Sequence, residues 1–114
     1  MNIIKVDEKY SIGFRPRDVQ FDSEKNEEED AVFVKTKILS FENHGSEFLY
    51  LVNFDTTTAF VKELSKHNRK VSSEISFSIL KKDMYIFDEN DNRVYDQEKI
   101  EEAYGTFKTH WENV

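Results

Sequence analysis

Residues 32–54 read V-F-V-K-T-K-I-L-S-F-E-N-H-G-S-E-F-L-Y-L-V-N-F, and this stretch decides the fold. Its first part, residues 32–41, is rich in the β-branched and aromatic residues that favour strands. Residues 42–46 then supply turn chemistry, because they combine Asn, Gly and Ser. Residues 47–54 alternate, which places the large apolar residues on one face: Phe48, Tyr50, Val52 and Phe54. The stretch predicts a long β-hairpin with one apolar face.

Further short strands are predicted on both sides of this hairpin. They are residues 11–14, 58–64, 74–80, 84–87 and 93–95. In residues 74–80 the alternation places Ile75, Phe77 and Ile79 inward and Ser76 and Ser78 outward. Pro16 follows the first strand, where it blocks a helix and biases Arg15 towards an extended conformation. Many short strands in one small chain predict a closed or nearly closed barrel, because closure removes exposed sheet edges.

The hydrophobic period changes at the C-terminal end of the chain. Ile100, Tyr104, Phe107 and Trp111 recur at the spacing of an amphipathic helix. Asp96 precedes this stripe and is a favourable N-cap residue. Residues 96–114 therefore predict a helical tail that docks on the barrel or on a neighbouring molecule. In the second case Tyr104, Phe107 and Trp111 would form an interface.

Composition limits the possible classes of protein. The 114 residues are enough for one domain, residues 1–114, and 34% of them are charged while 38% are hydrophobic. A core in so polar a chain must depend on aromatic rings, which make up 14% of the residues. The absence of cysteine excludes disulfides, cysteine zinc ligands and a cysteine nucleophile. No apolar run is long enough to span a bilayer, so we expect a soluble intracellular protein.

The formal net charge of −7 is concentrated in residues 22–30, which are acidic and lack apolar side chains. Such a run predicts a solvated loop. An acidic balance also argues against sequence-independent nucleic-acid binding, which requires a basic surface.

Motifs that would carry chemistry are missing from the sequence. The three glycines, Gly13, Gly45 and Gly105, lie far apart, and no phosphate-binding loop is present, so we expect no ATP binding or hydrolysis. The histidines lack the spacing of a zinc motif, and Arg93 replaces the glycine that a calcium loop starting at Asp88 would need. A Ser-His-Asp arrangement stays open, although no nucleophile motif marks it. We expect no cofactor, no metal and no catalytic residues.

Three stretches, taken in order, resemble motifs of one protein family. Residues 12–19 read I-G-F-R-P-R-D-V and resemble a G-x-R-P-E element. Residues 41–51 read F-E-N-H-G-S-E-F-L-Y-L and resemble a V-E-x-x-G-x-E hairpin. Residues 75–77 (I-S-F) and 84–88 (M-Y-I-F-D) resemble the closing strands of the same family. That family is the TOBE domain, which follows the ATPase domain in ABC importers of the maltose and multiple-sugar type.

The resemblance covers residues 12–95, with departures at Arg17, at the acidic stretch 22–30, at Asn92 and Arg93, and in the tail from Asp96. It implies an OB-like barrel that acts as an accessory, regulatory domain without activity of its own. The implied family positions are Gly13, Arg15, Pro16, Gly45, Glu47, Phe87 and Asp88. Most of these would shape the barrel: Gly13 and Gly45 would permit tight turns, and Arg15 would tie a strand end to a carboxylate.

The resemblance also implies partners and a location. The chain would be a fragment of a longer ATP-binding subunit, in contact with its own ATPase domain and with the second ATPase subunit. Membrane permease subunits and, in some members, a regulatory protein would complete the assembly at the cytoplasmic face of the membrane. Two alternatives remain at this point: an oxyanion-binding barrel of the molybdate type and an OB-type nucleic-acid-binding domain.

Overall fold

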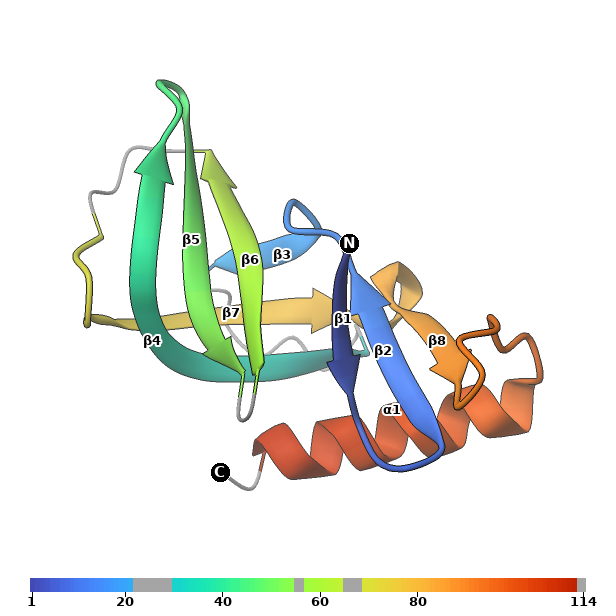
Figure 1. Cartoon of the computed structure of the whole chain (residues 1–114). Helices are drawn as coiled ribbons and strands as arrows, with labels where there is room; N and C mark the ends of the chain where they lie inside the picture. Colours follow the sequence, from blue (N-terminus) through green and yellow to red (C-terminus); the bar gives the residue numbers. More distant parts are fainter. Residues whose placement is uncertain (22–29, 55–56, 65–68, 113–114) are drawn as a thin grey trace.

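The computed structural model describes residues 1–21, 30–54, 57–64 and 69–112 (Figure 1). Its strands are β1 (Asn2–Lys5), β2 (Tyr10–Phe14), β3 (Val19–Phe21), β4 (Ala31–Asn43), β5 (Glu47–Phe54), β6 (Thr57–Leu64), β7 (Glu74–Leu80) and β8 (Tyr85–Asp88). A 3₁₀ turn, η1 (Lys81–Asp83), precedes β8, and the helix α1 (Gln97–Glu112) follows it. The expected hairpin, β4–β5, and the expected C-terminal helix are both confirmed.

The strands form two antiparallel sheets, one in the order β1-β2-β8 and the other in the order β3-β7-β4-β5-β6. The long strand β4 curls the larger sheet, because residues 31–37 pair with β7 whereas residues 38–43 pair with β5. A register irregularity between Ile38 and Ser40 lies where the pairing changes, and such irregularities bend strands. The larger sheet is thus a half-barrel, as the strong curvature of β4 in Figure 1 shows.

Hydrogen bonds join the edge of the half-barrel to the smaller sheet. The Asn2 side chain donates to the Phe60 carbonyl oxygen at 2.7 Å and accepts from the Phe60 amide at 2.8 Å. The Lys62 amide donates to the Pro16 carbonyl oxygen at 2.8 Å. The edge of β6 is therefore partly satisfied, which limits its tendency to pair with another chain. The fold is mainly β, a small barrel-like domain with one C-terminal helix.

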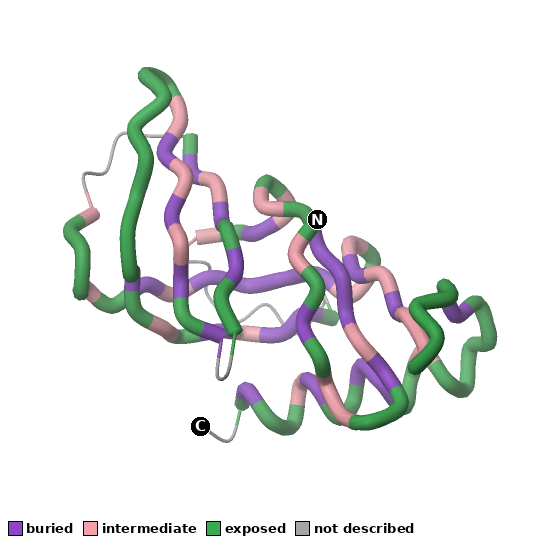
Figure 2. Tube along the Cα trace, viewed as in Figure 1, coloured by how far each residue is buried: buried purple, intermediate pink, exposed green. Residues whose placement is uncertain are grey.

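The core is aromatic, as the composition predicts, and Phe54 lies at its centre. The ring of Phe54 has four aromatic neighbours at centroid distances from 4.6 to 6.3 Å: Phe14, Phe77, Phe107 and Trp111. These neighbours belong to the smaller sheet, to β7 and to α1. Figure 2 shows buried positions alternating along β5, as expected for a sheet with one face in the core, whereas β7 is buried along most of its length.

Helix α1 lies against the chain's own barrel. The Asp96 carboxylate accepts from the amides of Glu98 at 2.9 Å and Lys99 at 3.2 Å, which confirms the expected N-cap. The buried side chains of α1 are Ala103, Tyr104, Phe107 and Trp111. From the sequence, this apolar stripe could pack on the barrel or on a neighbouring molecule. In the structure it packs on the chain's own barrel. No helix in the described part of the chain is long and apolar enough to cross a membrane.

Three details differ from expectation. Ser78 is buried, not outward-facing in solvent, because β7 is an inner strand and the side chains of Gln20 and Phe33 flank it. Residues 93–95 form only one bridge, Phe87 to Arg93, and no strand. Gly13 lies inside β2 and not in a tight turn. The predicted acidic loop falls on residues 22–29, outside the described residues, except for Asp30.

Candidate interaction surface

The outer face of the sheet β1-β2-β8 brings together several of the residues that the sequence singled out. Alternation sends Ile4, Ile12, Phe14 and Ile86 into the core. The opposite face carries the side chains that alternate with these. They are Met1, which precedes β1, Ile3 and Lys5 in β1, Ser11 and Gly13 in β2, Arg15 directly after β2, and Tyr85 and Phe87 in β8. We call this set, together with Arg93 and Tyr95, the outer face.

Gly13 lies at the centre of the outer face, where neighbouring side chains occupy the space above it. A Cβ atom at this position would lie 2.7 Å from Met1 Sδ, 2.9 Å from Phe87 Cε2 and 3.1 Å from Ile3 Cδ1. These separations are too short for carbon or sulfur atoms, so a side chain here would displace its neighbours. The glycine thus allows close approach of Met1, Ile3 and Phe87, which form an apolar seat.

Two arginines and two tyrosines stack beside this seat. The Arg93 guanidinium carbon lies 4.5 Å from the centroid of the Tyr85 ring and 5.1 Å from that of Tyr95. The Arg15 guanidinium carbon lies 5.8 Å from the Tyr85 centroid. These distances are typical of cation–π contacts. Arg15 therefore contacts an aromatic ring, where the sequence suggested a carboxylate.

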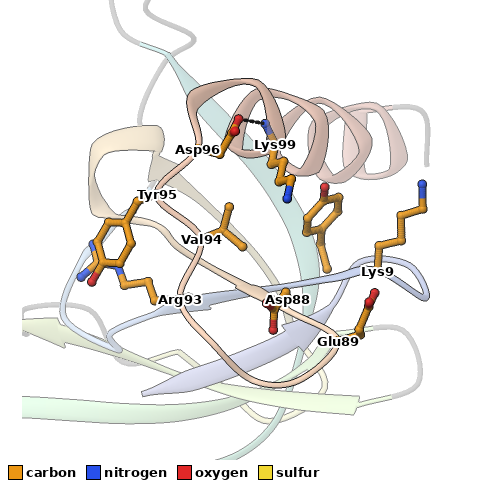
Figure 3. Close-up of a pocket in the computed structure, with 9 residues that line it drawn as sticks. Lys9, Asp88, Glu89, Arg93, Val94, Tyr95, Asp96 and Lys99 are labelled. Carbon is orange, nitrogen blue, oxygen red and sulfur yellow. Dashed lines mark hydrogen bonds between the residues drawn. The ribbon is translucent and has the colours of Figure 1, made fainter.

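The turn after β8 places Arg93 and Tyr95 on this face. The Asp88 carboxylate accepts from the amides of Asn90 and Asn92, both at 2.9 Å, and Asp91 has a positive φ of 62°. The chain then returns along β8, and the Val94 amide donates to the Ile86 carbonyl oxygen at 2.8 Å. Figure 3 shows the consequence: Val94 points towards the helix, whereas Arg93 and Tyr95 lie together on the other side. Asp88 is thus a turn-forming residue.

A cavity of about 450 Å³ lies beside this turn (Figure 3). Its lining mixes basic side chains (Lys9, Arg93 and Lys99) with acidic ones (Asp88, Glu89 and Asp96). Asp88 and Asp96 already accept backbone hydrogen bonds, so they are engaged in the turn and in the helix cap. The described residues contain no group of three or more His, Cys, Asp or Glu side chains placed to bind a metal ion.

The remaining family positions lie on other parts of the barrel. Gly45 has a φ of +85° at the tip of the β4–β5 hairpin, a conformation that favours glycine, so its expected tight turn is confirmed. Glu47 forms a half-exposed ion pair with Lys62 at 3.4 Å. Pro16 contributes the carbonyl oxygen that links the turn after β2 to β6. None of these three belongs to the outer face.

A buried ion pair, Glu63–Arg69, lies near the end of β6. Glu63 is 6% exposed, and its carboxylate accepts from Arg69 through Nε at 2.9 Å and Nη2 at 3.0 Å. The Tyr50 hydroxyl donates to the same carboxylate at 3.0 Å. Burial, together with this hydrogen bond to an anion, raises the pKa of Tyr50 to about 12. The cluster links Arg69 to β6 and β3, because Arg69 also lies 5.4 Å from the Phe21 ring centroid.

Another ionic cluster fastens the helix to the barrel. The Tyr104 hydroxyl donates to the Asp30 carboxylate at 2.7 Å, and Lys108 approaches the same oxygen at 3.4 Å. Lys81 bonds to Glu101 on the first half of the helix. The hydrogen bond from Tyr104 lowers the pKa of Asp30, while burial and the nearby carboxylate raise the pKa of Tyr104.

Sequence reasoning did not identify Tyr85, Arg93 and Tyr95 as members of a surface. A signal was present, since Arg93 and Tyr95 flank the apolar Val94 and must share a face if the segment is extended. The pairing of Glu63 with Arg69 had no comparable signal, because it joins a strand residue to a residue outside any regular element.

Comparison with known proteins gives no assignment for this chain. It matches no protein-family model and no curated protein.

Removing the buried carboxylate should destabilise the protein strongly. Glu63→Ala takes away the shared acceptor of Tyr50 and Arg69, and losing one partner of a buried ion pair costs about 3–5 kcal/mol. Glu47→Ala is the matched control, since it breaks an exposed pair worth about 1 kcal/mol or less. Urea unfolding measures both free energies of unfolding. Equal, small losses in the two variants would show that the buried pair does not support the fold.

Stability should fall in alkaline solution. The pKa of Tyr50 is about 12 in the folded chain and near 10 when unfolded, so the folded state retains a proton that the unfolded state releases. The contribution of Tyr50 is thus complete below pH ~10 and is lost as the pH rises towards ~12. Urea unfolding at pH ~9 and ~11 should reveal this decrease. Tyr50→Phe should reduce the pH dependence, whereas Tyr95→Phe, at an exposed position, should leave it unchanged.

Proposed function

We propose that this chain is a non-catalytic interaction domain, and that it is the TOBE-type barrel of an ABC-importer ATP-binding subunit for a sugar or a related solute. The observation that carries the proposal is the pairing of β2 with β8. It brings the I-G-F-R-P stretch beside the Y-I-F-D stretch, with Gly13 opposite Tyr85 and Ser11 opposite Phe87. Two of the three stretches that resemble the family thus depend on each other sterically.

The packing around Gly13 makes this dependence specific. Because Phe87 Cε2 would lie 2.9 Å from a Cβ at position 13, the glycine of one stretch allows the phenylalanine of the other to approach closely. The hairpin resemblance adds support, since Gly45 adopts the positive φ that only glycine accepts readily.

The use of the polar side chains supports an accessory role. The buried carboxylate of Glu63 is held by Tyr50 and Arg69, and the carboxylates of Asp88 and Asp96 cap a turn and a helix. These groups stabilise the fold. The outer face, in contrast, exposes aromatic, apolar and arginine side chains, the residue types that are enriched in protein interfaces.

The proposed partners follow from this assignment. The domain would contact the ATPase domain of its own polypeptide, the second ATPase subunit and, through the assembled transporter, the permease subunits at the inner membrane face. Since Tyr104, Phe107 and Trp111 are buried against the barrel, these contacts would use other surfaces, and the outer face is the best candidate.

Isolation of the protein from the cells that encode it tests the assignment. An antibody against the domain should capture a polypeptide much larger than 13.6 kDa, because the ATPase domain precedes the barrel, and permease subunits should accompany it. The isolated 114-residue chain should show no saturable ATP binding by calorimetry. Capture of a 13.6 kDa chain without an ATP-binding subunit would contradict the transporter assignment.

A further inference from the structure

The outer face of this acidic protein carries two arginines. The formal net charge is −7, and the carboxylates of Asp7, Glu8, Asp88, Glu89 and Asp91 gather near Lys5 and Ser11, whereas Arg15 and Arg93 lie beside Tyr85. In the described part of the chain, neither arginine forms an ion pair with an acidic side chain, and both lie over tyrosine rings instead. Arg15 and Arg93 are therefore two positive groups on this face that form no ion pair within the described residues.

Stacking prepares the two guanidinium groups for an anionic partner. A guanidinium that lies on an aromatic ring keeps its N–H groups at the edge of its plane, where they can donate to a carboxylate in pairs. Contact with Tyr85 also restricts both side chains, which lowers the entropy that binding would cost. Arg15 and Arg93 thus offer two partly ordered donor groups on one face.

The spacing of these groups suits an extended peptide. Since the guanidinium carbons lie 5.8 and 4.5 Å from one ring centroid, their separation is no more than the sum of those distances. Side chains two residues apart in an extended peptide share a face and are separated by about 7 Å. Two carboxylates at positions i and i+2 can therefore reach one arginine each.

The apolar seat next to the arginines offers a third contact. Met1 is 56% exposed and Ile3 is 49% exposed, and both pack with Phe87 above Gly13. An apolar side chain at position i+4 of the same peptide would lie on the same face as the carboxylates. Its burial against this seat would add affinity that is insensitive to salt.

We propose that the outer face binds an extended acidic segment of a partner protein, with two carboxylates on Arg15 and Arg93 and an apolar side chain on the seat of Ile3 and Phe87. This inference rests on the proposed function in its broad form, an interaction domain, and does not depend on the transporter assignment. A peptide is favoured over a nucleic acid because the net charge of −7 repels an extended polyanion, whereas two local carboxylates need only two cations.

The test uses the complete chain and a fluorescently labelled peptide whose centre reads Glu-Ser-Glu-Ser-Leu. Fluorescence anisotropy should show saturable binding that weakens when the salt concentration rises from ~50 to ~500 mM. Replacing both glutamates of the peptide by glutamine should abolish binding. Arg15→Ala and Arg93→Ala should each weaken binding about tenfold, as expected for loss of one charge-assisted pair.

Arg17→Ala is the matched control, because Arg17 is an exposed arginine in the turn after β2 and takes no part in the stack. It removes the same charge and should leave binding unchanged. Thermal unfolding of all three variants checks that they fold equally well. The proposal is overturned if the glutamate peptide does not bind, if Arg17→Ala weakens binding as much as the other two, or if an oligothymidine of equal length binds more tightly than the peptide. These outcomes do not bear on the transporter assignment, which is tested separately by the mass of the polypeptide captured from cells.

Discussion

The contact of the Phe54 ring with four other aromatic rings is the interaction on which the rest of the structure depends. A chain that is 38% hydrophobic has few aliphatic residues with which to fill the space between a half-barrel, a second sheet and a helix. Phe54 fills this space at the end of β5, where it meets Phe14, Phe77, Phe107 and Trp111. Burial of each such ring removes a large apolar area from water, so this cluster determines where the helix lies.

The position of the helix in turn defines the accessible face of the smaller sheet. Because α1 covers the chain's own core, the opposite side of β1-β2-β8 carries the side chains that alternation excludes from that core. Ion pairs join Glu101 and Lys108 of the helix to Lys81 and Asp30 of the barrel, and the Glu63–Arg69 pair lies near the end of β6. Polar side chains therefore fasten the periphery, while the outer face is left with arginines, tyrosines and apolar groups.

Most of the fold follows from the sequence because its signals are local. The alternation of Phe48, Tyr50, Val52 and Phe54, and the helical spacing of Tyr104, Phe107 and Trp111, each act within one element, and both are found as expected. The surface of Arg15, Tyr85 and Arg93 depends on register between separate strands, which periodicity does not encode. Burial of Ser78 depends on which strands flank β7, and the Glu63–Arg69 pair joins β6 to a residue outside any strand. Local patterns therefore predicted the longer strands, the hairpin and the helix, whereas tertiary pairing determined the surface.

The helix and the barrel form one cooperative core around Phe54. The protein has a single tryptophan, Trp111, and its ring lies 4.6 Å from that of Phe54, so its fluorescence reports the helix–barrel contact. Urea unfolding followed by this fluorescence and by the amide I infrared band of the strands measures both parts in the same samples. One shared core predicts coincident transitions with the same midpoint. A Trp111 transition at a lower urea concentration than that of the strands would show that the helix docks on a barrel that is already complete, and would contradict this account.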